Sequence, residues 1–187
     1  LLSVVTCLQV KAQYMPVVFD KVYGDKNQIQ LVCPLPGDEV ALVGKEGQKY
    51  NLTWVEREGG VIFSLPLTGF TAVNEIVELD NSRVLVVGQS SVPNVKGKKD
   101  KITLCGRIVV INRGGRIVSD IYAGDQGSNF LKGMLLRSGA FVVSGSEPKG
   151  ADGRQGILLK LDPTGSVVYQ YKNAGGGYCD QFAVMGN

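Results

Sequence analysis

Histidine is missing from this sequence of 187 residues. Its absence removes the commonest general base, the commonest zinc ligand and every Ser-His or Cys-His nucleophile pair. No Cys-x-x-Cys pair occurs, which argues against zinc binding and thioredoxin-like redox chemistry. No glycine-rich loop leads into a helix-like segment, so the usual phosphate-binding loop is missing too. We therefore predict no catalytic residue, no metal ligand and no cofactor in this segment.

An excess of charge of one sign is missing as well. Lys and Arg number 20 against 17 Asp and Glu, which gives a net charge of +3. Such a balance is too mild to indicate nucleic acid or an anionic membrane as a partner. One basic cluster precedes a strand-like run, and we interpret it as a solvated loop rather than a polyanion site. Its members are Lys96, Lys98, Lys99 and Lys101.

A long hydrophobic run is also lacking, and the short apolar run that opens the sequence cannot cross a membrane as a helix. Val10 and Ala12 give the pattern of a secretory cleavage site before Gln13. We predict that residues 1–12 are part of a signal peptide and that the protein is exported to the periplasm, the cell surface or the medium. A buried first strand or short helix and a lipoprotein acylated at Cys7 are the alternatives.

The cysteines are few and widely spaced, at Cys7, Cys33, Cys105 and Cys179. Removal of the signal leaves three, an odd number. One disulfide with a free thiol and three reduced thiols are both permitted. Each cysteine lies beside apolar residues, so we expect burial as a small hydrophobic side chain.

Glycine, by contrast, is abundant, with 25 residues spread along the chain. Hydrophobic residues make up 44% of the sequence and charged residues 20%. This composition is typical of a globular protein. The spread of glycine indicates many tight turns between short strands.

Three segments repeat one pattern of strand, polar turn, strand and glycine, at 30–44, 74–88 and 133–145. Their turns contain Pro-Gly-Asp, Asp-Asn-Ser and Arg-Ser-Gly, which suit tight hairpins. The strands are apolar on both faces, as a sheet between two neighbours requires. Their final glycines permit either a close backbone approach or a sharp exit turn. These glycines are Gly44, Gly88 and Gly145.

A second hairpin follows each segment, at 52–63, 108–118 and 157–169. Alignment of Gly60, Gly115 and Gly165 gives separations of 55 and 50 residues. Units of four strands and about 50 residues are typical of β-propeller blades. We predict an all-β, propeller-like fold with about three four-stranded antiparallel blades, the start of a fourth and an incomplete ring. A β-sandwich is the alternative, but it does not require similar hairpin pairs to recur.

The repeat also sets the expected domain organisation. We place the partial propeller at 13–187. Its blades cover roughly 25–69, 70–121 and 126–172, with the start of the next at 173–187. A ring usually needs about four to eight blades. We therefore expect the remaining blades to follow in the same chain.

Segment 156–169, Gly-Ile-Leu-Leu-Lys-Leu-Asp-Pro-Thr-Gly-Ser-Val-Val-Tyr, resembles bacterial exported propeller repeats. Their general form contains h-h-K-L-D-x-x-G-x-h-x-W after a Tyr-Gly-Gly join, and Tyr169 stands where that form often has Trp. The segment is similar, more loosely, to pyrroloquinoline-quinone-type propeller repeats. The resemblance covers about residues 19–187. It implies the architecture and no ligand, because these positions are structural.

Carboxylates in three kinds of loop are candidates for chemistry. Segments 125–128 and 152–154 offer oxygen ligands but too few carboxylates for calcium. Segment 162–165 resembles a sialidase-type Asp box, yet its spacing is that of a hairpin turn. Glu56 and Glu58 suggest a carboxylate pair for glycoside hydrolysis, but a hairpin turn would leave them solvated. We interpret all of these residues as structural.

The sequence therefore favours an exported, non-catalytic module that binds a protein or a glycan through its loops and channel mouth. The alternative is a fragment of a propeller enzyme, either a quinone-dependent dehydrogenase or a hydrolase, whose active residues lie outside this segment. Convergent carboxylates on the channel face would favour the enzyme. A featureless or aromatic-lined channel would favour the binding module.

Overall fold

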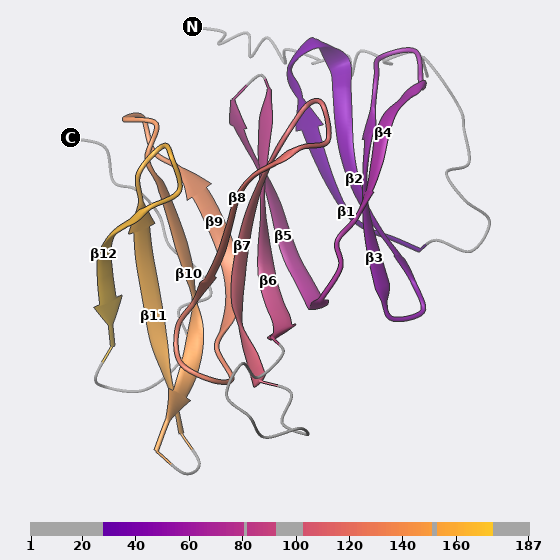
Figure 1. Cartoon of the computed structure of the whole chain (residues 1–187). Coiled ribbons are helices and arrows are strands. Elements are labelled where there is room, and N and C mark those ends of the chain that lie inside the picture. The colour runs from indigo at the N-terminus through magenta and orange to yellow at the C-terminus, as the bar shows by residue number, and fades with distance from the viewer. Residues whose placement is uncertain (1–27, 81, 93–102, 151–152, 174–187) are drawn as a thin grey trace, which may run out of the picture.

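The computed structural model describes residues 28–80, 82–92, 103–150 and 153–173. These residues form twelve strands in three four-stranded antiparallel sheets (Figure 1). Within the described residues the sheets do not close into a ring. The predicted all-β fold, with three four-stranded blades in an incomplete ring, is confirmed. No helix in the described ranges has the length and apolar character needed to span a bilayer.

Each sheet is a meander in which strand order follows chain order. The first sheet contains β1 (Gln28–Leu35), β2 (Glu39–Glu46), β3 (Lys49–Val55) and β4 (Val61–Pro66), with a 3-10 turn, η1 (Pro36–Asp38), after β1. The second contains β5 (Phe70–Asp80), β6 (Arg83–Val92), β7 (Thr103–Asn112) and β8 (Ile117–Ala123). The third contains β9 (Asn129–Leu135), β10 (Phe141–Lys149), β11 (Gly153–Leu161) and β12 (Val167–Lys172).

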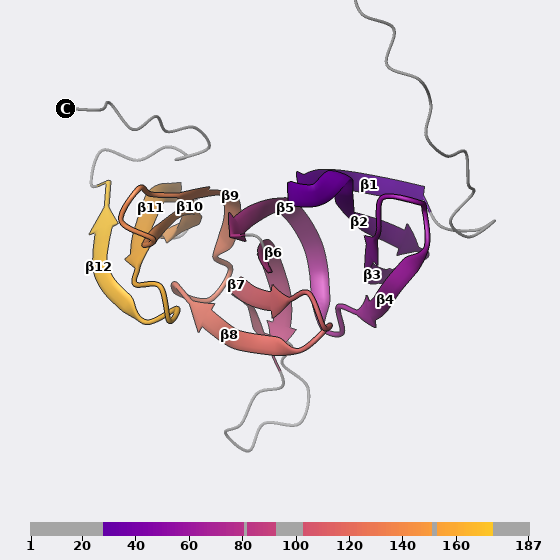
Figure 2. The same cartoon turned by 90° about the horizontal axis from the view of Figure 1, so that it is seen from above.

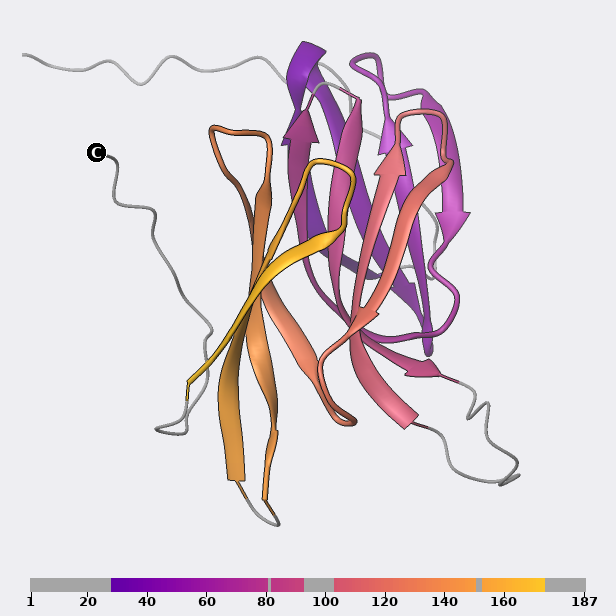
Figure 3. The ribbon, with the colours of Figure 1, turned by 60° about the vertical axis from the view of Figure 1, so that its left-hand side comes forward.

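The sheets stand side by side, with β1, β5 and β9 along one side of the molecule (Figure 2). The β4–β5 and β8–β9 connections emerge at the same end of the sheets as the β2–β3 turn (Figure 3). We call this the connection end, and the opposite end the hairpin end. The connection end brings together loops from neighbouring sheets.

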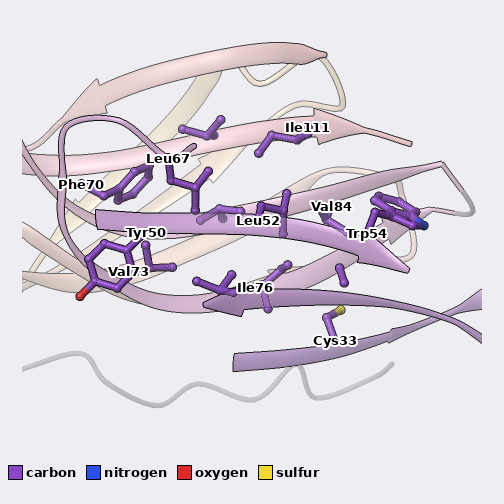
Figure 4. Close-up of a cluster of buried hydrophobic side chains, with 14 of the residues drawn as sticks. Cys33, Tyr50, Leu52, Trp54, Leu67, Phe70, Val73, Ile76, Val84 and Ile111 are labelled. Carbon is purple, nitrogen blue, oxygen red and sulfur yellow. The ribbon is translucent and has the colours of Figure 1, made fainter. Parts of the chain in front are cut away.

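Two apolar cores hold neighbouring sheets together. The first lies between the first and second sheets and contains Trp54 (Figure 4). The second lies between the second and third sheets. Along β6, Val84 and Val86 belong to the first core, whereas Leu85 and Val87 belong to the second. Because side chains alternate between the faces of a strand, the middle sheet needs apolar residues at successive positions of β6, here 84–87.

Four hairpins share one turn geometry. In each, the first turn residue accepts a hydrogen bond from the fourth and donates one to the fifth, over 56–60, 112–116, 136–140 and 162–166. The fourth residue is a glycine with φ of 78°, 76°, 80° and 95° in these turns. This is a type I turn followed by a left-handed glycine. In the first sheet that glycine is Gly59, so the alignment through Gly60 is wrong by one residue. The corrected separations are 56 residues from Gly59 to Gly115 and 50 residues from Gly115 to Gly165.

The repeat glycines lie inside strands rather than at strand ends. Strand β6 continues past Gly88 to Val92, so the alternative of a sharp exit turn is wrong. A Cβ atom on Gly88 would lie 2.0 Å from the carbonyl oxygen of Ala72. One on Gly145 would lie 2.1 Å from that of Asn129. These two glycines therefore permit the first strand to cross close to the second.

Cys33 and Cys105 are buried free thiols, as expected for small hydrophobic side chains. Burial raises the pKa of both thiols. Several predicted features lie outside the described residues. They are the signal-like residues 1–12, the basic cluster between Lys96 and Lys101, Cys179, and the start of a further blade from residue 174 onward.

Candidate functional site

A pocket of about 350 Å³ opens at the connection end, between the first and second sheets. One wall is the β2–β3 turn with the start of β3, residues 48–51, and the other is the β4–β5 connection, residues 66–70. Both walls exist because β3 and β4 are antiparallel hydrogen-bonded neighbours, so the start of β3 and the end of β4 lie at the same side of the sheet. The next sheet begins at Phe70.

Backbone hydrogen bonds hold the β4–β5 connection against both the first and the second sheet. The amide of Leu67 donates to the carbonyl of Tyr50 at 2.8 Å, and the amide of Ser91 donates to that of Gly69 at 2.9 Å. Gly69 has a φ of +87°, and a Cβ there would lie 3.2 Å from the hydroxyl of Ser90. The pocket wall is therefore fixed by contacts to both sheets.

Arg107 supports this wall from behind. Its guanidinium, on β7, makes paired hydrogen bonds of 2.8 Å to both carboxylate oxygens of Asp120 on β8. A third hydrogen bond, from Nη1, reaches the carbonyl of Thr68 at 2.6 Å. The same group lies 4.7 Å from the ring centre of Phe70 and 5.0 Å from that of Tyr122. Arg107 thus ties the pocket wall to the middle sheet through several charge-assisted contacts.

The pKa of Arg107 reflects this environment. Burial by itself would lower that pKa, but the hydrogen bonds and the charge of Asp120 outweigh burial and raise it. Arg107 is 7% exposed, and each of its three guanidinium nitrogens donates to a protein acceptor. Arg107 is therefore a positioning residue for the pocket rather than a group that meets a ligand.

The two aromatic rings of the pocket do not present open faces. Tyr50 is 7% exposed and Phe70 is 5% exposed. The ammonium of Lys45 lies 5.1 Å from the ring centre of Tyr50, and Arg107 covers Phe70. The rings form apolar walls, but neither can act as a flat platform for stacking.

Polar side chains surround these walls. Gln48, Lys49 and Thr68 are exposed, and Asn51 is partly exposed. The side-chain amides of Gln48 and Asn51 and the hydroxyl of Thr68 make no hydrogen bond to any other group of the described residues. Lys49 is the one charged residue of the lining. The pocket therefore combines an apolar interior with a polar, weakly cationic rim, which is typical of small binding sites.

A second polar cluster lies at the matching place between the second and third sheets. Glu147 is fully buried and accepts hydrogen bonds from Lys172 at 2.6 Å, from Gln155 at 2.8 Å and from the amide of Asp125 at 3.2 Å. The bond to Glu147, more than that to Asp125, raises the pKa of Lys172 although burial opposes it. This cluster stabilises the β8–β9 connection. Its polar groups form hydrogen bonds with one another.

Of the loop carboxylates noted in the sequence, Asp152 lies outside the described residues, and the structure accounts for the others. Asp125 pairs with Lys172, whose ammonium lies 3.1 Å away. The carboxylate of Asp162 accepts hydrogen bonds from the backbone amides of Thr164 and Ser166 within its turn, both at 2.9 Å. Glu56 and Glu58 are exposed at the turn after β3. In the described part of the chain, no group of three potential metal ligands comes together.

Sequence reasoning singled out none of the pocket residues. The pocket depends on two segments that meet only after the first sheet has formed. The one local signal is Pro66 followed by Gly69 between two strand-like runs, which marks a connection but not a site. No protein-family model matches the chain, and no curated protein matches it. The candidate site rests on geometry alone.

Proposed function

We propose that this protein is an exported, non-catalytic binding module of propeller-like repeats, related in pattern to bacterial exported repeats. Its ligand is a segment of a partner protein, held in the pocket formed by 48–51 and 66–70. The observation that carries this proposal is the lining itself. Apolar walls are rimmed by amide and hydroxyl side chains that are accessible to a ligand.

The covered rings favour a peptide over a glycan. A sugar presents apolar C–H faces that pack best on an open aromatic face, and Tyr50 and Phe70 offer none. An apolar peptide side chain needs only an apolar surface to pack against. The side-chain amides of Gln48 and Asn51 can donate to and accept from the backbone of such a peptide. Lys49 favours a neutral or acidic segment over a basic one.

The experiment is selection from a random peptide library displayed on phage, with a glycan array in parallel. We expect peptides to be recovered, and Thr68→Trp, which fills the pocket, to weaken their binding by about tenfold or more. Ser138→Trp, on an exposed turn at the hairpin end, is the matched control and should leave binding unchanged. Peptides that bind Thr68→Trp equally well, or binding of glycans only, would contradict the proposal. Binding of a quinone instead would support the enzyme alternative.

Export is the second part of this proposal and rests on the signal-like residues 1–12. The expected result is a secreted mature protein that begins at Gln13. Amino-terminal sequencing of the secreted material tests this. Retention of the protein inside the cell with residues 1–12 attached would contradict export.

A further inference from the structure

The backbone acceptors of the β4–β5 connection are already used inside the protein. The carbonyls of residues 67–69 accept hydrogen bonds of 3.3, 2.6 and 2.9 Å, from Phe70, Arg107 and Ser91 in that order. The carbonyl of Tyr50, on the opposite wall of the pocket, accepts the amide of Leu67. These two walls therefore offer a ligand few free backbone acceptors.

The backbone donors of the same connection are free. The amides of Thr68 and Gly69 donate to no group in the described part of the chain, and both residues are exposed and line the pocket. Residues 67–70 form a turn that the amide of its last residue closes, and Gly69 has a φ of +87°. Such a turn does not use the amides of its two central residues. Two neighbouring donors are therefore available at the pocket.

Arg107 sets the direction of one of these donors. Because every described peptide bond is trans, the amide of Gly69 points opposite to the carbonyl of Thr68. That carbonyl points at Arg107, which lies behind the wall and is not part of the pocket lining. The amide of Gly69 therefore points away from Arg107, toward the exposed side of the connection. A hydrogen bond accepted by one end of a peptide group also strengthens donation by its other end.

Side chains of the lining add further donors and one positive charge. The hydroxyl of Thr68 and the side-chain amides of Gln48 and Asn51 are accessible. Lys49 makes no ion pair within the described ranges, although Glu46 lies across the β2–β3 hairpin from it. No carboxylate is among the described residues that line the pocket. Unused donors, one ammonium and no lining carboxylate together favour an anionic group on the ligand.

The lining suits a carboxylate better than a phosphate. A phosphate group carries about two negative charges at neutral pH and is typically bound by several arginines. The pocket has one charged lining residue, Lys49, and the nearby Arg107 is already paired with Asp120. The apolar lining residues Leu67 and Phe70 favour an apolar group next to the carboxylate.

We propose that the pocket recognises a carboxylate carried next to an apolar side chain. The amides of Thr68 and Gly69 and the ammonium of Lys49 hold the carboxylate, and the apolar side chain packs between the walls. This inference rests on the proposed function and narrows its peptide ligand to one class. Either a chain that ends in an apolar residue or an acidic residue beside an apolar one supplies this chemistry. Arg107 is then a positioning residue that acts through the peptide group between Thr68 and Gly69.

The first test is an NMR titration of the 187-residue chain, labelled with nitrogen-15. The probes are N-acetylleucine and its neutral amide, which differ only in the carboxylate. We expect the acid to bind about fivefold more tightly or better, and to shift the amide signals of Thr68 and Gly69 downfield. N-acetylaspartylleucine amide carries its carboxylate on a side chain. Whichever of the two acids binds more tightly identifies the source of the carboxylate.

The second test removes the donors one at a time. Lys49→Gln should lower the preference for the acid at least twofold, whereas Lys160→Gln, exposed on β11 and outside the lining, should leave it unchanged. Thr68→Pro removes a backbone donor at a turn position that accepts proline. It should weaken binding of N-acetylleucine more than Thr68→Ala, the matched control that loses only the hydroxyl.

The role of Arg107 has a separate readout. In Arg107→Lys the downfield shift caused by N-acetylleucine should fall more at the amide of Gly69 than at that of Thr68, because Arg107 holds the peptide group that carries the Gly69 amide. An equal fall at both amides would show that Arg107 supports the wall without directing the donor.

Equal affinity for N-acetylleucine and its amide would overturn the proposal, and so would the absence of acid-induced shifts at Thr68 and Gly69. The proposed function has its own test, the selection of library peptides that lose binding in Thr68→Trp. If those peptides bind while neither leucine probe does, the carboxylate preference is wrong and the peptide pocket stands. If neither peptides nor probes bind, both are wrong.

Discussion

Arg107 shows how one buried cation can organise a loop between sheets. Its contacts reach β8 through Asp120, the β4–β5 connection through Thr68, and the ring of Phe70 at the start of β5. A buried charge costs free energy unless it is paired and hydrogen-bonded. The planar guanidinium meets this condition because it donates in several directions at once.

Arg107→Lys tests this role. A lysine keeps the charge but cannot donate to both oxygens of Asp120 and to Thr68, so we expect the free energy of unfolding to fall by about 2 kcal/mol. Urea denaturation measures the change. Arg57→Lys is the control, because Arg57 has a side-chain exposure of 61% and, among the described residues, a single ion pair at 3.5 Å. Equal stability of Arg107→Lys and wild type would show that the paired geometry contributes nothing.

Ser144 is the opposite case, a buried polar group without a partner. Its hydroxyl is inaccessible and makes no hydrogen bond to any described residue. Valine occupies the equivalent positions 43 and 87, so we expect Ser144→Val to raise the free energy of unfolding by about 1 kcal/mol. Ser146→Val should have the opposite effect, since the Ser146 hydroxyl accepts a 2.9 Å hydrogen bond from Arg154. Loss of stability in Ser144→Val would mean that this hydroxyl has a partner outside the described residues.

At the scale of the elements, the repeating unit is a pair of hairpins, the second of which turns through a left-handed glycine. The sequence indicates these turns well, because glycine favours the positive φ that each one needs. It misplaces one of them, since Gly59 and Gly60 are adjacent and only the structure shows which has positive φ. A local pattern cannot separate two neighbouring glycines.

Gly145→Ala tests the close crossing of β9 and β10. The new methyl group would lie 2.1 Å from the carbonyl oxygen of Asn129, so the strands must separate, and we expect a loss of about 2 kcal/mol or more. Gly150→Ala is the control, because Gly150 has a φ of +66° but no atom within 4 Å of an added Cβ. It should lose only about 1 kcal/mol through backbone strain. A smaller loss at Gly145 than at Gly150 would contradict the close-approach explanation.

At the scale of the whole molecule, stability depends on contacts between sheets as well as within them. Glu39 in the first sheet accepts hydrogen bonds from Trp54 at 2.6 Å and from Arg113 of the middle sheet. The hydrogen bonds from Arg113 lower the pKa of Glu39, and that from Trp54 adds to the effect although burial opposes it. One carboxylate therefore links the largest buried side chain of the first core to the neighbouring sheet.

The lowered pKa of Glu39 gives stability a pH dependence with a defined sign. The unfolded carboxyl has the higher pKa, so its contribution is present in full above that pKa. It is lost as the pH falls through the folded pKa. We expect the free energy of unfolding to decrease below about pH 5 in the wild type and less steeply in Glu39→Gln. Urea denaturation at a series of pH values measures both slopes, with Glu58→Gln as the exposed control. Identical slopes in wild type and Glu39→Gln would show that other carboxylates dominate.

Local sequence patterns are enough to predict the strands, most of the turns and their grouping into three four-stranded units. These follow from local rules, since apolar residues on both faces of a strand and glycines at positive φ leave few other structures open. The candidate site, by contrast, depends on how the sheets pack together. The pocket joins 48–51 to 66–70, and Arg107 reaches it from another sheet. Contacts between segments far apart in the chain depend on how the sheets pack, and no local pattern records which side chains that packing brings together.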